Sequence, residues 1–321
     1  MSDSNAARAT PASGPVVDRL AIIGVGLIGS SVARAARQWG LARSIAIADA
    51  SAEALAAAER LGLGDFYASD PAEAAKGADL VILCVPVGAM AAAGAAVAPA
   101  LKPGAILSDV GSVKGSVAAQ LAPVTPPGVH LVPAHPVAGT ENSGPEAGFA
   151  TLFRNRWCIV TPPEGADPAA VETVSRFWSG MGANVETMSP ERHDLVLAVT
   201  SHLPHLIAYN IVGTAADLEQ VTRSEVIKFS AGGFRDFTRI AASDPTMWRD
   251  IFLHNRDAVL EMIGRFNEDL AALARAIRWG DGDTLFDLFT RTRAIRRGII
   301  DSGQETSEPD FGRRHDVSGA G

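Results

Sequence analysis

A glycine-rich turn near the N-terminus constrains the fold of this 321-residue chain most strongly. The apolar run Leu20–Ile23 leads directly into the sequence GVGLIG at 24–29, which has the spacing G-x-G-x-x-G, and a helical pattern follows over Ser30–Trp39. In such a turn the first glycine permits a tight bend, the second lets a pyrophosphate approach the backbone, and the third lets the helix pack on the strand. The N-terminus of the helix then favours an anion. The sequence therefore predicts a dinucleotide-binding unit.

An acidic residue twenty positions after the turn indicates which dinucleotide is bound. Asp49 ends the next apolar run, where a carboxylate accepts hydrogen bonds from both ribose hydroxyls of NAD and repels the 2′-phosphate of NADP. The alternative is a strand-end aspartate that starts a turn and caps a helix beginning near Ala52. We predict NAD as the cofactor, with contacts from Gly24, Gly26, Leu27, Ile28, Gly29, Asp49, Val85 and Pro86.

Apolar runs separated mostly by helical patterns occupy the first half of the chain. They are Leu20–Ile23, Ser44–Ala48, Leu80–Val85, Ala105–Ser108, Val129–Val132 and Trp157–Thr161. Continuous apolar character is typical of strands that are buried on both faces of a parallel sheet. We therefore expect an α/β fold with a doubly wound, mostly parallel sheet of the Rossmann type.

The second half of the chain has a helical pattern throughout. Ser189 is predicted to cap a helix with Pro190 in its first turn, and loops are expected near Ala231–Phe234 and Trp279–Asp283. The apolar faces of these helices are too large for one small domain to cover, which predicts a homodimer. The predicted division is a disordered tail at 1–17, the Rossmann domain at 18–188, an all-helical substrate and dimerisation domain at 189–301, and a disordered tail at 302–321.

Composition excludes several classes of protein. A net charge of −8 argues against nucleic-acid binding, and residues 1–15 lack the pattern of a secretory signal. The stretch Gly88–Ala100, taken as the only long weakly polar one, is too short to span a bilayer, so we expect a cytoplasmic protein without membrane contact. Cys84 and Cys158 lie in apolar runs and are expected to be inert core residues.

Two segments that follow predicted strands carry reactive side chains. Ser112 and Lys114 lie in such a segment, from which either can reach a nicotinamide or a substrate, although a plain turn with a helix cap explains the same residues. His135 follows another predicted strand end, and Pro136 fixes its backbone. A lone histidine is more often structural than catalytic, so His135 is ambiguous by itself.

Two further groups of polar residues lie in the helical half. Arg235 and Arg239 are four positions apart, and on one helix face they would clamp an anion, unless they form a solvated salt-bridge face. The series His193, Leu197, Ser201, His205 and Tyr209 recurs every four positions and is expected on one face of a helix that Pro204 kinks. No set of ligands has the spacing of a metal site, so no metal is predicted.

Several motifs together resemble the prephenate/arogenate dehydrogenase family of tyrosine biosynthesis. They are GVGLIGSS at 24–31, DVGSVK at 109–114, HPVAGTE at 135–141, SHLPH at 201–205 and the segment 232–248, which begins GGFRDFTRIA. The likeness covers roughly residues 18–300, and the last three motifs together are the specific ones. It implies a nucleotide-binding domain followed by a helical dimerisation domain.

The resemblance also implies roles for individual residues. His135 matches the catalytic histidine that accepts a hydrogen bond from the C4 hydroxyl of the substrate, and Ser112 matches a serine that contacts the same hydroxyl. Arg239 matches the arginine that binds a substrate carboxylate, with Arg235 near the same pocket. The remaining matches are His205, Glu141 and Asp236 at the pocket entrance and Trp248, which can approach the partner subunit's site.

The implied reaction is the NAD-dependent oxidative decarboxylation of prephenate to 4-hydroxyphenylpyruvate. Arogenate is the alternative substrate, but two arginines in Arg154–Trp157, and the lack of an acid there, favour the doubly anionic prephenate. A dehydrogenase of small β-hydroxy acids would need a catalytic lysine near the start of the helical domain. The only lysine of that domain is Lys228, which lies well after its start. A non-catalytic NAD sensor need not keep Ser112, His135 and Arg239 together.

Overall fold

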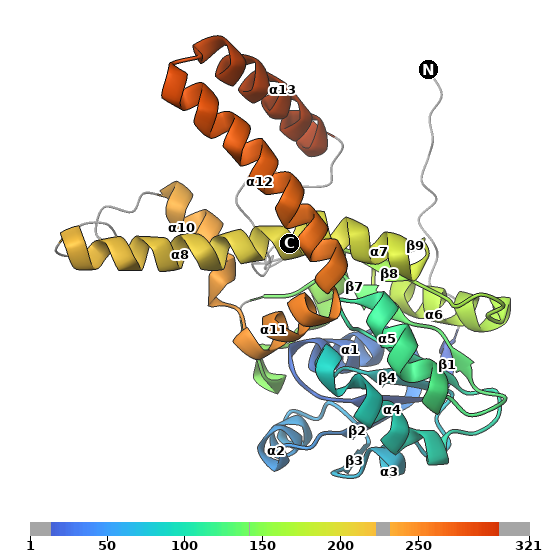
Figure 1. The fold of residues 1–321 in the computed structure, drawn as a ribbon. Helices are drawn as coiled ribbons and strands as arrows, with labels where there is room; N and C mark the ends of the chain where they lie inside the picture. The colour runs from blue at the N-terminus through green and yellow to red at the C-terminus, as the bar shows by residue number, and fades with distance from the viewer. Residues whose placement is uncertain (1–13, 141, 223–231, 302–321) are drawn as a thin grey trace, which may run out of the picture. The chain divides into compact units, whose positions relative to one another are not determined.

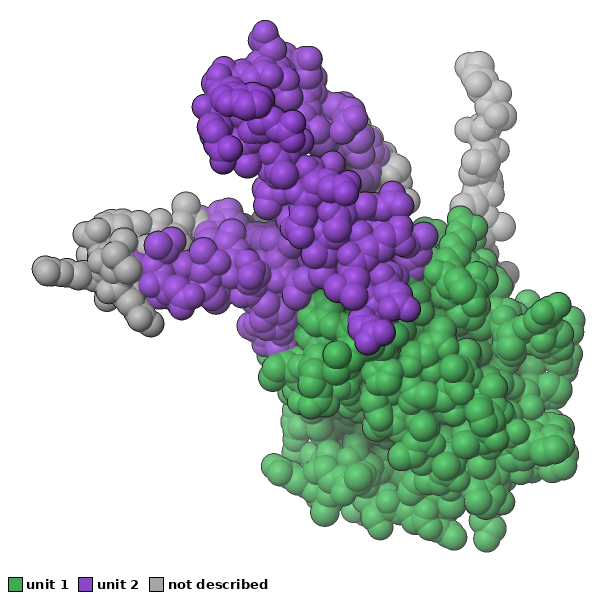
Figure 2. Space-filling view, viewed as in Figure 1, with its two compact units in different colours: residues 1–194, 244–254 green, residues 195–243, 255–321 purple. Residues whose placement is uncertain are grey.

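The computed structural model describes residues 14–140, 142–222 and 232–301 of the chain (Figure 1). The chain divides into two compact units, which Figure 2 colours separately. The first unit comprises residues 1–194 and 244–254, and the second comprises residues 195–243 and 255–321. The predicted tails fall largely on residues 1–13 and 302–321, which lie outside the described residues.

A parallel sheet forms the centre of the first unit. Within the described residues it has six strands in the order β3-β2-β1-β4-β5-β6, and every neighbouring pair is parallel. The strands are β1 (Val17–Ile23), β2 (Ala42–Ala48), β3 (Phe66–Ala68), β4 (Leu80–Leu83), β5 (Ile106–Asp109) and β6 (His130–Leu131). Strands run outward in both directions from β1, and ligands of such sheets bind beside this point, beyond the carboxyl ends of the strands.

Helices connect the parallel strands and bury them. They are α1 (Leu27–Gln38), α2 (Ala52–Arg60), α3 (Pro71–Ala75), α4 (Met90–Val97) and α5 (Lys114–Leu121), with the short 3-10 turns η1 (Val87–Ala89), η2 (Ala98–Ala100) and η3 (Ala122–Val124). All four residues of β4 are fully buried, so both of its faces are covered. The prediction of a parallel Rossmann-type sheet is confirmed.

A smaller sheet follows in the same unit, with three strands among the described residues. It consists of β7 (Ala134–Pro136), β8 (Trp157–Val160) and β9 (Asn184–Thr187). The 3-10 turns η4 (Pro145–Ala147) and η5 (Ala150–Phe153) connect β7 to β8, and helix α6 (Pro168–Gly180) connects β8 to β9. Only β8 is predicted from the sequence. His135 follows the end of strand β6, as predicted, but it also lies within a further strand, β7, where it pairs with Ile159 of the antiparallel β8.

A long helical run begins after β9. It consists of α7 (Pro190–Leu197), a π-helical turn η6 (Ala198–His202) and α8 (Leu203–Thr222), and the predicted cap is present because Ser189 Oγ accepts a hydrogen bond from Arg192 N at 3.3 Å. Pro204 follows the π turn directly; its ring would collide with a carbonyl one α-helical turn earlier. The wider turn shifts the helical register, so the prediction that residues from His193 to Tyr209 share one face is wrong.

The described remainder of the second unit is helical, as predicted. Its elements are α10 (Gly232–Thr238), the 3-10 turn η7 (Arg239–Ala242), α12 (Arg256–Trp279) and α13 (Gly282–Asp301). The loop expected at Ala231–Phe234 is wrong for 232–234, which lie in α10, whereas the turn after Trp279 is confirmed, with Gly280 in the left-handed conformation. Arg235 and Arg239 fall in α10 and η7, so they do not share a continuous α-helix.

One helical run in the described parts of the chain is long and apolar enough to cross a membrane. It is Pro190–Leu218, in which an 18-residue window has a mean hydropathy of 1.4. The sequence-based statement that Gly88–Ala100 is the only long weakly polar stretch is therefore wrong. Only 22% of its most apolar window is buried within the chain. Apolar helices of this kind also occur where a second protein copy covers them.

Helix α11 (Pro245–His254) belongs to the first unit although the segments on both sides of it belong to the second. Its Asp250 is 7% exposed and lies over Gly88 of η1, where a Cβ atom would come within 2.6 Å of Oδ2 of Asp250. At its end, His254 Nδ1 lies 2.8 Å from Ser116 Oγ on α5. These contacts dock α11 on η1, which follows β4, and on α5.

Candidate active site

The glycine turn has the geometry that a pyrophosphate requires. Gly24 has a φ of 96°, and a Cβ there would come within 2.5 Å of the carbonyl oxygen of Cys84; a Cβ on Gly29 would collide with the carbonyl oxygen of Gly24. By contrast, nothing lies within 4 Å of the Cβ position of Gly26, which precedes the first residue of α1. The first turn of α1 carries no acidic residue, and Gly26 supplies no side-chain cap. This open cradle at a helix N-terminus fits a dinucleotide.

Asp49 lies beside the turn, at the carboxyl end of β2. Its Oδ2 accepts a hydrogen bond from Val25 N at 2.8 Å, and its Oδ1 accepts one from Ser51 N at 2.8 Å. Each carboxylate oxygen can accept a second hydrogen bond, so the fixed carboxylate can still bind two ribose hydroxyls. The side chain that caps α2 is Ser51, which accepts a hydrogen bond from Ala54 N, and not Asp49.

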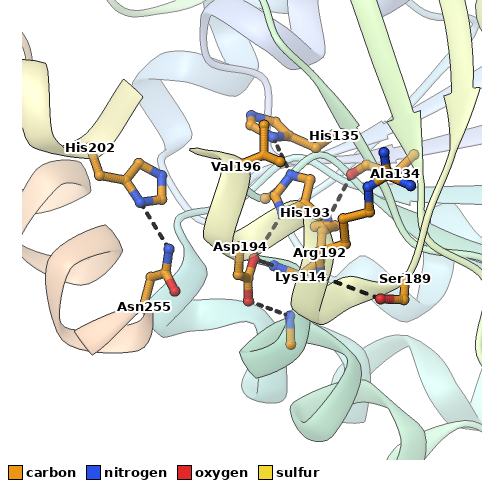
Figure 3. A network of polar contacts seen from close by, with 12 residues as sticks. Lys114, Ala134, His135, Ser189, Arg192, His193, Asp194, Val196, His202 and Asn255 are labelled. Atoms are coloured by element: carbon orange, nitrogen blue, oxygen red, sulfur yellow. Dashed lines mark hydrogen bonds and ion pairs between the residues drawn. The ribbon is translucent and has the colours of Figure 1, made fainter. Parts of the chain in front are cut away.

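His135, His193 and Asp194 form a chain of side-chain contacts that holds His135 in place (Figure 3). His135 is 6% exposed, and its Nδ1 lies 2.8 Å from Nε2 of His193, which is fully buried on α7. Nδ1 of His193 lies 2.8 Å from Oδ1 of Asp194. The two imidazole rings meet edge to face, with 5.0 Å between their centroids.

Asp194 is itself anchored by the N-terminus of α5. Its Oδ1 accepts a hydrogen bond from Lys114 N at 2.7 Å, and its Oδ2 accepts one from Gly115 N at 2.9 Å. These two bonds fix the position of the carboxylate at a helix N-terminus, which favours an anion.

The direction of hydrogen bonding along this chain follows from the carboxylate. An ionised Asp194 can only accept, so Nδ1 of neutral His193 carries the proton and its Nε2 carries the lone pair. Nε2 of His193 then accepts from Nδ1 of His135. We infer that the lone pair of His135 resides on Nε2, which makes that nitrogen a proton acceptor.

Burial lowers the pKa of His193, and the positive charge of Lys114 lowers it further. The hydrogen bond to Asp194 and the charges of Asp194 and Asp109 act in the opposite direction but do not outweigh burial. His193 therefore stays neutral to a lower pH than an ordinary histidine does. The order of hydrogen-bond donors along the chain depends on this neutral form.

Lys114 does not reach a nicotinamide or a substrate. Its side chain is completely buried, where Nζ forms an ion pair with Oδ2 of Asp109 and donates to the carbonyl oxygen of Ala134 at 2.8 Å. The prediction that Ser112 or Lys114 can reach the ligand is thus wrong for Lys114. Ser112 lies half-buried in the loop between Asp109 and Lys114.

The other predicted substrate residues lie elsewhere in the chain. His205 on α8 bonds through Nδ1 to the carbonyl oxygen of Ser201 at 2.8 Å, and burial together with the charge of Arg239 lowers the pKa of His205. Arg235 and Asp236 are exposed on α10. Trp248 is 5% exposed in α11 of the first unit, against Phe252. Glu141 lies outside the described residues.

The two cysteines are inert, and the described residues form no metal site. Cys158 is buried and Cys84 is partly so; burial raises the pKa of both thiols, which makes them poor nucleophiles. Across residues 14–140, 142–222 and 232–301, no group of three or more His, Cys, Asp or Glu residues is placed to hold a metal ion.

Comparison with known families accounts for both halves of the chain. Residues 32–187 match "Prephenate dehydrogenase, nucleotide-binding domain", and residues 189–291 match "Prephenate dehydrogenase, dimerization domain". The chain belongs to the prephenate dehydrogenase family. The resemblance that the sequence motifs indicate is therefore confirmed, and so is an α/β fold followed by a helical domain.

Individual members of the prephenate dehydrogenase family match along most of their length. The chain is 44% identical to the cyclohexadienyl dehydrogenase of Zymomonas mobilis, over 88% of this chain and 97% of that protein. It is 35% identical to the prephenate dehydrogenase of Bacillus subtilis, over 88% of this chain and 76% of that protein. The crystal structure of the A. aeolicus prephenate dehydrogenase with hydroxyphenyl propionate and NAD+ has a TM-score of 0.82 and 34% identity, covering 88% of this chain and 98% of that one. The predictions of a dehydrogenase and of NAD as its cofactor are confirmed.

Two residues of this candidate site, His193 and Asp194, are not predicted from the sequence. Their spacing places His193 on a helix face with His205 and gives no signal for Asp194, although the pair directly follows the capped start of α7. Their partner His135 is 58 residues away in sequence, and only the fold brings the two imidazoles together.

Proposed function

We propose that this enzyme converts prephenate to 4-hydroxyphenylpyruvate and CO₂, with His135 as the catalytic base. The observation that carries the proposal is the chain of contacts from His135 through His193 to the carboxylate of Asp194. With Asp194 accepting and each imidazole donating from Nδ1, the proton-accepting lone pair lies on Nε2 of His135. Membership of the prephenate dehydrogenase family supports the choice of substrate.

Charge flow during the reaction explains why a neutral imidazole is needed. NAD+, when bound in the cradle at Gly26, accepts the hydride that leaves C4 of the substrate. Nε2 of His135 takes the proton of the C4 hydroxyl, so that the oxygen can supply electrons as the C4–H bond breaks. The C1 carboxylate then leaves as CO₂, and its bonding electrons complete the aromatic ring. The resulting phenolate recovers the proton from His135.

Ser112 and Arg239 complete the proposed site. Ser112 contacts the same C4 hydroxyl and keeps it oriented toward His135. Arg239 binds a carboxylate of the substrate, because a guanidinium pairs with a carboxylate through two parallel hydrogen bonds. The charge of Arg239 already acts on His205 in the second unit. His205, Arg235, Asp236 and Glu141 are proposed to supply polar contacts at the pocket entrance. Trp248 is proposed to contribute near the partner subunit's site.

Prephenate is preferred over arogenate on electrostatic grounds. Prephenate carries a keto group where arogenate carries an ammonium, so prephenate has the greater net negative charge. The segment Arg154–Trp157, which leads into β8, contains two arginines and no acid. An enzyme that uses both substrates is the alternative, supported by the similarity to the cyclohexadienyl dehydrogenase of Zymomonas mobilis.

Purified enzyme tests this function directly. Prephenate and arogenate are each supplied with NAD+ or NADP+, and nicotinamide reduction is followed by absorbance. We expect the highest kcat/KM with prephenate and NAD+. Turnover of arogenate alone, or no turnover of either substrate with NAD+, would refute the proposal.

We also propose a cytoplasmic homodimer with a Rossmann domain at 18–188 and a helical domain at 189–301. The helices of the second unit expose large apolar side chains, among them Leu260, Ile277, Trp279 and Phe286 at 57–73%. A second copy would cover such faces, and the family description of this half as a dimerization domain supports it. Light scattering at micromolar concentration should give twice the mass of the chain, 33.4 kDa; a monomer would contradict the proposal.

A further inference from the structure

Lys114 is a charged side chain that the proposed reaction does not use. It is completely buried at the first position of α5, together with the equally buried Asp109. Removing both charges from water costs several kcal/mol per ion, and apolar replacements of such pairs are often as stable. Stability alone is therefore a poor explanation for a buried lysine at this position.

The contacts of the pair join two separate segments of the site. Oδ2 of Asp109 accepts hydrogen bonds from Gly111 N at 2.7 Å and from Nζ of Lys114, which closes the loop that carries Ser112. The same Nζ donates to the carbonyl oxygen of Ala134, the residue before His135. The ammonium thus connects the loop of Ser112 to strand β7 of His135.

The backbone of the same lysine supports the other end of the histidine chain. Lys114 N donates to Asp194 Oδ1, the atom that also bonds His193 (Figure 3). One residue therefore contacts the strand of His135 through its side chain and the carboxylate that orients His193 through its main chain.

We propose that Lys114 is a positioning residue, whose buried ammonium sets the placement of Ser112 relative to His135 and thereby directs both toward one substrate hydroxyl. This inference rests on the proposed roles of Ser112 and His135. Lys114 acts through these residues and makes no contact with the substrate.

The charge of Lys114 has a second effect, on the histidine chain. The groups that face His193 are His135 on β7, Asp194 beside it, and Lys114 and Asp109 from the segment around the start of α5. Lys114 opposes protonation of His193, whereas Asp109 and Asp194 favour it. Loss of the ammonium should therefore raise the pKa of His193 and extend its protonated state to higher pH.

The first test is Lys114→Met, with a second variant that avoids a lone buried charge. In the double variant Asp109→Asn with Lys114→Met, the amide oxygen of Asn can still accept from Gly111 N, but no ion remains and the bond to Ala134 is lost. We expect kcat to fall by about 10²-fold, as small misplacements of reacting groups do. The KM for NAD+ should change less than about 2-fold, because the cofactor cradle is intact.

Lys102 provides a matched control. Its Nζ also bonds a carboxylate and a carbonyl oxygen, those of Asp79 at 2.5 Å and Gly77 at 3.1 Å, but this pair is partly exposed. Lys102→Met should leave kcat and its pH profile unchanged. In Lys114→Met the acid limb of kcat should move to higher pH, an effect that a purely structural role would not produce.

A readout without substrate separates this proposal from the proposed function. In protein with ¹⁵N-labelled histidine, NMR reports which ring nitrogen of His135 is protonated, with His135→Asn and His193→Asn used for assignment. The wild type should show the Nδ1–H form, and the folded double variant a mixture. A wild type that does not oxidise prephenate overturns the function only. A folded double variant with unchanged kcat, pH profile and tautomer overturns the role of Lys114.

Discussion

Nδ1 of His135 lies 2.8 Å from Nε2 of His193, so one imidazole fixes the protonation of the other. Because His193 is held in turn by Asp194, we infer that the accepting nitrogen of the proposed base His135 is set before any substrate binds. In many enzymes a histidine base is oriented by a carboxylate directly; here a second histidine lies between them.

Replacement of His135 tests the base itself. His135→Asn should lower kcat by about 10²–10⁴-fold, the usual contribution of a positioned base. Binding of NAD+, measured by fluorescence titration, should be unchanged because the glycine turn does not involve His135. An unchanged kcat would remove His135 from this role.

Replacement of Asp194 tests whether the base must be oriented. In Asp194→Asn the amide can donate to Nδ1 of His193, which permits the opposite order of donors, and kcat should fall by about 10²-fold or more. Asp167→Asn is the control, because Asp167 also caps a helix, bonding Ala169 N at 3.0 Å, and lies 3.6 Å from His130. Equal activities of the two variants would contradict the relay.

The pH dependence of kcat follows from the neutral state of His193. A protonated His193 would donate from Nε2 to His135 and force the proton of His135 onto its own Nε2, where it blocks catalysis. Because the pKa of His193 is lowered, kcat should be constant above the ordinary histidine pKa of about 6.5 and fall only at lower pH. Steady-state measurements of kcat from about pH 5 to about pH 8, the range in which histidine titrates, test this expectation. A decline that begins above that ordinary value would contradict it.

Replacement of Arg239 tests substrate binding. Arg239→Ala should raise the KM for prephenate by roughly 10- to 10²-fold, the value of a charge-assisted hydrogen bond to a carboxylate, with a smaller change in kcat. Arg43→Ala is the control, since Arg43 pairs with Asp18 on the surface of the first unit. An effect on kcat alone would be inconsistent with a binding role.

The contact between Gly88 and Asp250 predicts a stability effect. Gly88→Ala places a Cβ 2.6 Å from Oδ2 of Asp250, and such overpacking costs about 1–3 kcal/mol of unfolding free energy. Thermal denaturation measures the loss. Adding Asp250→Ala to Gly88→Ala should restore part of the lost stability, because it removes the side chain that the new Cβ meets. If the stability changes of the two single variants simply add in the double variant, the contact between residues 88 and 250 does not cause the loss.

Much of the fold could be predicted because its signals are local. Strands β1, β2, β4, β5 and β8 each contain an apolar run of buried residues, such as Leu20–Ile23 in β1 and Leu80–Leu83 in β4. Strand β3 has only three residues and β9 is largely exposed, so neither has that pattern. Strand β7 also has only three residues, and it starts a second sheet directly after β6, which no periodicity indicates.

The site divides in the same way. The glycine turn and Asp49 could be predicted because their spacing is fixed within one strand–helix–strand unit. The pairing of His135 with His193, and the burial of Lys114, depend on contacts between distant segments. The π turn at Ala198–His202 arises from two opposing local preferences. The surrounding residues favour a regular α-helix, whereas the ring of Pro204 disfavours the α-helical backbone of the preceding turn.

The assignment of α11 to the first unit bears on how this enzyme can be dissected. A fragment cut at the sequence boundary near Met188 would lack Asp250 and His254, the residues that cover Gly88 and Ser116. Such a fragment would expose the loop after β4, which carries Val85 and Pro86, two of the proposed cofactor contacts. A recombinant nucleotide-binding half should therefore be engineered with 244–254 joined back through a linker, and not obtained by simple truncation.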